Sequence, residues 1–318
     1  MMMNPVLSRE LRERMRTGRA FVVVGIFLSL LTLTAYLVYQ GSTTTGDISA
    51  DLARQTRLGR DLYEWVLFVM LALVLFFVPA LTAGAIAGER ERQTLLPLQV
   101  TLLRPRSILV GKVLAGSSFM LLLLFASLPV MMVAYLLGGI RPLDGLKGVG
   151  IICVIAILLT LMVTALSALT RRVQTATLLA YGFTALLVLL GPLLYLTMSV
   201  ADGSEGNDVE NPPALLLALN PITIVADAAA GDNTSNSGFS SNNPLEWARS
   251  GVIKAKSLND DSWFAWFPDD NFRAQFRVEG KDDGFPAWAL GVVGLADLAA
   301  LLSFLAVRRL RTPAETER

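Results

Sequence analysis

Six long apolar segments constrain this chain more than any other feature of its sequence. They lie at 20–39, 65–87, 113–137, 149–170, 174–199 and 286–307, and each is almost free of charged residues. A helix needs roughly 20 apolar residues to cross the hydrocarbon core of a bilayer. Only 17% of the 318 residues are charged and the mean hydropathy is +0.55, whereas soluble domains carry about 25% charged residues. The sequence therefore predicts an all-α integral membrane protein with six transmembrane helices.

The distribution of basic residues predicts that both termini are cytoplasmic. In that orientation 16 of the 27 Lys and Arg residues, but only six of the 26 acidic residues, fall in cytoplasmic segments. Basic residues favour the cytoplasmic side of membrane proteins. All five tryptophans lie outside the spans or at their outer ends, where amphipathic rings favour the headgroup region. We expect a multi-pass protein of the bacterial cytoplasmic membrane.

The segment before the first span is expected to form a cytoplasmic amphipathic helix within residues 1–19. Leu7, Leu11 and Met15 recur every fourth residue, and arginines occupy another face. This pattern is typical of a helix that lies on an anionic membrane surface. The alternative is a solvated basic tail that only sets the topology. At the other end of the chain, residues 308–318 form a short cytoplasmic tail.

Residues 20–200 hold the first five predicted helices, and an extracytoplasmic region, 201–285, separates them from the sixth helix at 286–307. Within that region the segment 213–230 is apolar but short, and Asn220-Pro221 interrupts it. A re-entrant or interfacial helix is the favoured interpretation. The alternative, a seventh span, would move the C-terminal arginines to the outer side. The remainder of the region carries no enzyme signature.

The residue types that most enzymes and metal sites use are scarce. There is no histidine, and the one cysteine, Cys153, lies in an apolar run, so imidazole bases, His-ligated metals and Cys-rich clusters are excluded. A net charge of +1 gives no reason to expect a nucleic-acid partner. One acid, Asp297, falls near the centre of the last span, where carboxylates are costly and often functional. Its candidate roles are a structural hydrogen bond to another helix and the coupling of protons or cations.

The segment 84–112 carries the most specific pattern, and it reads GAIAGERERQTLLPLQVTLLRPRSILVGK. Alternating charges at 89–92 precede a short apolar stretch, and Pro105 is expected to break the chain ahead of the third span. A cytoplasmic loop this apolar needs a cover, either a protein groove or the membrane surface. A helix that docks into a partner protein is the direct interpretation.

This segment resembles the permease subunits of ATP-binding cassette (ABC) transporters of the type-2, or exporter, class. Those permeases commonly show Gly-Glu-Arg-Glu-x-Gly-Thr-Leu, a short helix, and then Thr-Pro-Leu-Ser-x-x-x-Ile-x-x-Gly-Lys. The matching residues are Gly88, Glu89, Arg90, Glu91, Thr94, Leu95, Thr101, Leu103, Ile108, Gly111 and Lys112. Gln93 and Leu102 stand where Gly and Pro are usual, and Pro97 interrupts the short helix. The opening Asn4-Pro5-Val6-Leu7 and the Asn220-Pro221-Ile222-Thr223 pattern also look like this class.

The resemblance implies a non-enzymatic subunit whose cytoplasmic coupling loop, 88–112, docks onto a separate ATPase. The residues it assigns to coupling are Glu89, Arg90, Glu91, Arg92, Thr94, Leu95, Leu98, Thr101 and Arg104. The Gly-Lys pairs at 111–112 and 280–281 lack the flanking residues of a P-loop. ATP and Mg²⁺ would therefore bind the partner, and no cofactor or metal is expected in this chain. The expected partners are two copies of an ABC ATPase, a second membrane subunit that is identical or related, and the lipid bilayer.

Two other functions stay open on the sequence alone. An ion-coupled carrier or channel, with Asp297 as the coupling group, would work without an ATPase and usually has more polar groups inside the membrane. A membrane scaffold driven by the ATPase would share the fold and move no cargo. For a permease, the substrate path is expected between the two membrane subunits near the second and fifth spans. No residue there identifies the substrate.

Overall fold

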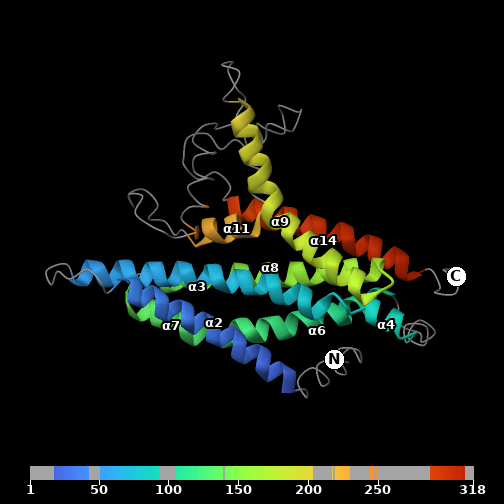
Figure 1. The fold of residues 1–318 in the computed structure, drawn as a ribbon, viewed down its shortest axis with the longest axis horizontal. Coiled ribbons are helices and arrows are strands. Elements are labelled where there is room, and N and C mark those ends of the chain that lie inside the picture. The colour runs from blue at the N-terminus through green and yellow to red at the C-terminus, as the bar shows by residue number, and fades with distance from the viewer. Residues whose placement is uncertain are drawn as a thin grey trace.

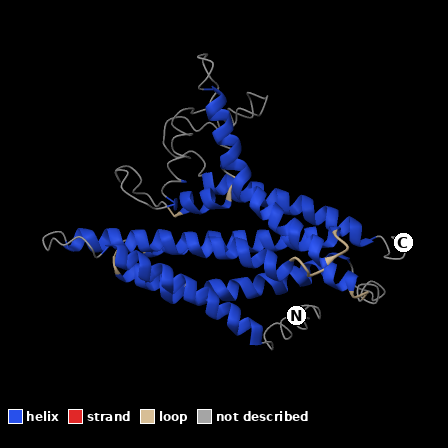
Figure 2. Ribbon diagram, viewed as in Figure 1, coloured by secondary structure: helices blue, strands red, loops and turns tan. Residues whose placement is uncertain are grey.

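The computed structural model describes residues 18–42, 51–93, 105–138, 140–202, 217, 219–229, 244–245, 248 and 287–311, and all regular structure in them is helical (Figure 2). Six helical segments are long and apolar enough to cross a membrane: Phe21–Gly41, Gln55–Glu91, Arg106–Leu136, Pro142–Leu169, Val173–Leu194 and Trp288–Leu310. They coincide with the six predicted spans, so the all-α membrane fold is confirmed for the described residues. The amphipathic helix predicted within 1–19 lies almost wholly outside them, and the orientation of the termini stays a prediction.

The helices form an elongated bundle (Figure 1). In chain order they are α2 (Gly18–Ser42), α3 (Asp51–Thr82), α4 (Ala87–Glu91), α6 (Pro105–Ala126), α7 (Leu128–Leu136), α8 (Pro142–Leu169), α9 (Val173–Asp202), α11 (Pro221–Ala228) and α14 (Ala287–Arg311). α3 and α8 pack against each other through the middle, with α2, α6 and α7 on one side and α9, α11 and α14 on the other (Figure 1). α6 and α7 together make the third span.

Three helices begin well before the predicted spans. α8 begins at Pro142, seven residues early. α3 begins at Asp51, and α6 begins at Pro105. A new helix thus begins at Pro105, the proline expected to break the chain ahead of the third span, because proline suits the first turn of a helix, where its missing N–H is not needed. The stretch before it, 94–104, lies outside the described residues. As a result Arg106 and Lys112 lie on a helix that continues into the membrane, and not in a loop.

α8 lies at the centre of the bundle and is apolar on all sides, which is typical of a buried helix. It contacts α3, α6, α9, α11 and α14. Two buried threonines satisfy their hydroxyls within the helix: Thr160 Oγ1 donates to the Ala156 carbonyl and Thr164 Oγ1 to the Thr160 carbonyl, both at 2.7 Å. Such bonds to the preceding turn remove the cost of burying a hydroxyl. α8 therefore needs no polar partner from another helix at these positions.

α3 approaches the first turns of α8 closely at Gly148. The Tyr63 hydroxyl of α3 donates to the Asp144 carbonyl of α8 at 2.9 Å, which holds the aromatic ring over Gly148. A β-carbon at Gly148 would overlap the Tyr63 hydroxyl oxygen and lie 2.9 Å from Leu67 Cδ1. Only glycine fits this contact.

Gly148→Ala is expected to destabilise the protein by about 1–3 kcal/mol, because the added methyl overpacks a buried contact. Gly150→Ala is the matched control on the same helix, since a β-carbon there meets nothing within 4 Å. That control should be neutral or stabilising by up to about 1 kcal/mol, because alanine favours helix over glycine. Thermal unfolding of both variants in detergent measures the difference in Tm. If the Tm of Gly148→Ala is as high as that of Gly150→Ala, the close contact at Gly148 is absent.

The apolar segment at 213–230 contains α11, a helix of eight residues, which is too short to cross a bilayer. The alternative of a seventh span is therefore wrong. α11 packs against α8 and α14, and most of its side chains are buried, among them Thr223, Ile224 and Val225. At its end the Asp227 carboxylate accepts a hydrogen bond from the Trp288 backbone N–H at 2.9 Å, which satisfies a donor at the beginning of α14.

Asn220 connects α11 to a proline-interrupted part of α9. Its side-chain oxygen accepts from the Ile222 N–H at 2.9 Å and caps α11, while its amide nitrogen donates to the Val188 carbonyl at 2.9 Å. Pro192 lies four residues after Val188 within α9, and proline has no N–H to give that carbonyl. Asn220 thus satisfies the backbone group that Pro192 leaves without an intrahelical donor. Neighbouring side chains commonly make proline tolerable in membrane helices in this way.

We expect Asn220→Asp to destabilise the protein by roughly 1–3 kcal/mol, because aspartate keeps the capping acceptor but cannot donate to the Val188 carbonyl. Pro192→Ala restores an N–H four residues after Val188, so in that background the cost of Asn220→Asp should shrink. Unfolding free energies of the two single variants and the double variant give the coupling directly. A cost of Asn220→Asp that is the same in both backgrounds would show that the donor role is absent.

Candidate coupling site

α4 lies at the end of the bundle where α8 ends and α9 begins (Figure 1). A turn at 83–86 leads into it from α3. The first backbone N–H groups of a helix have no partner within the helix. Here the hydroxyl oxygen of Ser167 on α8 accepts from the N–H groups of Ile86 and Ala87, at 3.1 and 3.0 Å. The position of α4 is thus set by a buried side chain from a distant part of the sequence.

Glu89 connects α4 to α6. The Lys112 ammonium lies 2.8 Å from a Glu89 carboxylate oxygen, and the lysine side chain is only 3% exposed while that of Glu89 is 30% exposed. A lysine this deeply buried is costly unless it is paired. The acid of α4 and the base on α6 therefore form one structural unit.

Arg90 and Glu91 serve the two helix ends at the α8–α9 junction. One guanidinium nitrogen of Arg90 donates to the carbonyls of Ala168 and Thr170, at 3.2 and 2.9 Å. A cation at the C-terminus of α8 satisfies free carbonyls and complements the helix dipole. The Glu91 carboxylate accepts from the Val173 N–H at 3.0 Å, which does the same for the N-terminus of α9 with the opposite charge.

The beginning of α9 also packs closely against the turn 83–86 and against α4. β-carbons added at Gly84 and Gly88 would lie 3.4 and 3.6 Å from the Val173 side chain, so these two small residues face an internal helix neighbour. Just beyond α4, Gln93 has a φ of 57°, a left-handed conformation that glycine adopts most easily. The permeases that this segment resembles usually carry glycine here, and glycine adopts such a φ with less strain.

The structure brings together three of the predicted coupling residues and places a fourth beside them. Glu89, Arg90 and Glu91 contact α6, α8 and α9 as described, and Arg92 is exposed at the end of α4. The other predicted coupling residues lie outside the described residues: Thr94, Leu95, Leu98, Thr101 and Arg104. Sequence reasoning missed Ser167 and the pairing role of Lys112. A lone serine near the end of an apolar span and a lysine inside the start of another were the available signals.

Asp297 lies on the outside of α14. It is exposed, as are Val293 and Leu301 one turn away on either side, and it makes no hydrogen bond or ion pair with any described residue. A structural hydrogen bond from Asp297 to another helix of this chain is therefore not found in the described part. A coupling role for Asp297 stays a prediction. No group of three metal-binding side chains occurs among the described residues.

These features define a polytopic membrane protein in which Glu89, Arg90 and Glu91 connect α4 to three spans at one end of the bundle. The family model for "ABC-2 family transporter protein" matches residues 4–307, so the chain belongs to this family. It is the membrane permease subunit of an ABC-2 transporter, a class of subunit that lacks ATPase activity, and its membership implies an ATPase partner. None of the curated proteins compared with the chain matches it.

Lys112→Met is expected to lower the free energy of unfolding by roughly 2 kcal/mol, because it leaves the Glu89 carboxylate partly buried without its cation. Lys147→Met is the matched control: Lys147 lies 3.7 Å from Asp144 but is 63% exposed, and exposed pairs contribute about 0–1 kcal/mol. Thermal unfolding of both variants measures the difference. If Lys147→Met costs as much as Lys112→Met, the Glu89–Lys112 pair does not hold α4 to α6.

Proposed function

We propose that this permease couples ATP hydrolysis on two ATPase subunits to the export of a substrate across the bacterial cytoplasmic membrane. The segment 88–112 is the coupling element, and its apolar part, with Leu95 and Leu98, docks into the ATPase. In this proposal both termini are cytoplasmic, as the basic residues favour. The substrate itself is not identified by any residue described here.

The observation that carries this proposal is the set of contacts that α4 makes. Glu89 pairs with Lys112 on α6, Arg90 binds the end of α8, and Glu91 binds the beginning of α9. α4 comes directly before residues 94–104, and α6 begins directly after them. A displacement of that segment by a closing ATPase would therefore act on three spans at once, through short polar contacts.

A second membrane subunit, identical or related, completes the transporter in this proposal, with the substrate path near α3 and α9. Two helices that carry broad exposed apolar faces are consistent with such a partner. On α9, Leu178 is 76% and Leu189 is 64% exposed, and on α14 the exposed face includes Val293 and Leu301, with Asp297 between them. Lipid would cover whatever part of these faces the partner does not.

Family membership favours the ATPase-coupled function over an ion-coupled carrier. The isolated and exposed position of Asp297 adds no relay of polar groups of the kind carriers use. An ATPase-driven scaffold would use the same contacts of Glu89, Arg90 and Glu91. Only the movement of cargo distinguishes it from a permease.

The double variant Leu95→Asp/Leu98→Asp is expected to lose the ATPase that co-purifies with the intact protein from its native host, because two carboxylates would be forced into an apolar contact. The readouts are the stoichiometry of the bound ATPase and the ATP hydrolysis of the purified complex. The fold is checked independently by thermal unfolding.

Leu143→Asp/Leu146→Asp is the matched control. These leucines are 71% and 68% exposed near the beginning of α8, at the far end of the bundle from α4. This variant should retain the ATPase. If the intact protein brings no ATPase, or if both variants lose it equally, the proposed coupling role of the segment 88–112 is wrong.

A further inference from the structure

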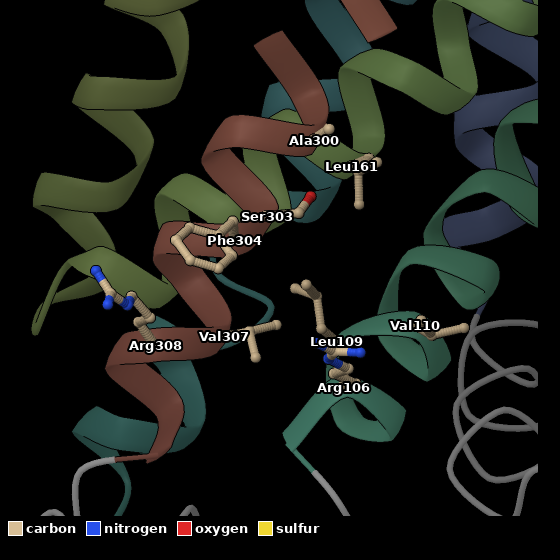
Figure 3. Close-up of a pocket in the computed structure, with 9 residues that line it drawn as sticks. All are labelled: Arg106, Leu109, Val110, Leu161, Ala300, Ser303, Phe304, Val307 and Arg308. Carbon is tan, nitrogen blue, oxygen red and sulfur yellow. The ribbon is translucent and has the colours of Figure 1, made fainter. Parts of the chain in front are cut away.

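A cavity of about 540 Å³ lies between α6, α8 and α14 at the end of the bundle that bears α4. Its volume is within the range of pockets that hold small ligands, about 300–1,000 Å³. Leu109 of α6 and Val307 of α14 point toward each other across it, and Leu161 of α8 lies deeper (Figure 3). The wall is apolar apart from Ser303 and two arginines, Arg106 and Arg308, which line the end nearest the termini of α6 and α14.

The two arginines give the cavity its charge. Both are exposed, and neither makes an ion pair with a described residue. The Arg308 guanidinium lies 5.1 Å from the centre of the Phe304 ring in a cation–π contact, and its side chain lies on the side of α14 that faces away from α6 (Figure 3). The nearby Lys112 is already paired with Glu89. The cavity thus has two cationic groups at one end that are available to an anion.

The cavity is not closed from the lipid. Val110 of α6 is 50% exposed and Phe304 of α14 is 55% exposed, and both lie on spans. From Arg308 to Ala300 the wall follows nine residues of α14, a rise of about 12 Å along the helix. A ligand that matches both parts has an anionic group near the arginines and a hydrocarbon portion that extends into the membrane.

We infer that this cavity binds one anionic phospholipid, with its phosphate at the rim that Arg106 and Arg308 line and an acyl chain against Leu109, Leu161 and Val307. Basic pockets between transmembrane helices on the cytoplasmic side suit such headgroups. The leaflet is the cytoplasmic one in the orientation proposed above. The inference goes beyond the proposed coupling function, since it assigns a lipid site to residues of α6, α8 and α14.

The experiment measures lipid retained by the full chain in native mass spectrometry, after exchange into micelles that contain phosphatidylglycerol or phosphatidylcholine. The intact protein should retain one phosphatidylglycerol in preference to phosphatidylcholine. The R106Q/R308Q variant should bind phosphatidylglycerol about 30-fold more weakly, the loss expected for two arginines near the membrane surface. Equal retention of the two lipids by the intact protein would overturn the inference.

Two further variants locate the site. R92Q/R172Q removes two exposed arginines at the same end of the bundle but outside the cavity, and it should bind phosphatidylglycerol as the intact protein does. A300W leaves both arginines in place and fills the cavity, so it should no longer retain phosphatidylglycerol. This variant tests the site independently if R106Q/R308Q fails to fold. A loss in R92Q/R172Q equal to that in R106Q/R308Q, or full retention in A300W, would contradict this site.

The source of the anion is tested with inorganic phosphate. Millimolar phosphate should not displace the bound phosphatidylglycerol, because it lacks the acyl chain that the apolar wall contacts. Displacement would show a site for a soluble anion and overturn the lipid assignment. A phosphatidylglycerol with a photoreactive acyl chain should label peptides of α6 and α14, and labelling confined to other helices would also overturn it. Each of these readouts is independent of ATPase binding, so failure here leaves the proposed coupling function standing.

Discussion

The need to satisfy the backbone groups at the junction of α8 and α9 organises one whole end of this protein. α8 ends at Leu169 and α9 begins at Val173, so free carbonyls and free N–H groups face each other across three residues. Arg90 satisfies the carbonyls, and Glu91 satisfies an N–H. Opposite helix ends call for opposite charges, which explains why an alternating run of acid and base lies beside them. The same run, through Glu89, reaches Lys112 on α6.

The other end of the bundle shows the same constraint with different residues. There Pro192 leaves the Val188 carbonyl without its usual donor, and the Asn220 amide supplies one. Asp227, at the far end of α11, caps the beginning of α14. α11 is thus a short connector that satisfies backbone groups of two spans, and its burial follows from that role. Membrane proteins have little water with which to satisfy such groups, so neighbouring side chains must do it.

The six spans were predictable because length and apolarity alone determine them. The short helix within 213–230 was predictable in type, since Asn220-Pro221 is a good helix start. The partners of Glu89, Arg90 and Glu91 were not, because each lies on another span and no local pattern reports a contact between residues some 20 to 80 positions apart. α6 begins at Pro105, eight residues before the predicted span, because the polar residues of its first turns hide this part of the helix from a search for apolar length. The coupling residues from Thr94 to Arg104 stay predictions.

The proposed coupling requires α4 to stay in contact with α9, so that a displacement of residues 94–104 is passed on to that span. This requirement is tested most directly by cross-linking the Gly88→Cys/Val173→Cys variant, in a Cys153→Ala background, with a short bifunctional thiol reagent. These positions are suitable because a β-carbon at Gly88 would lie 3.6 Å from the Val173 side chain. The account predicts that ATP hydrolysis by the assembled transporter is the same before and after cross-linking. Hydrolysis that is abolished by the cross-link and restored by reduction would contradict it, because α4 would then have to separate from α9 in each cycle.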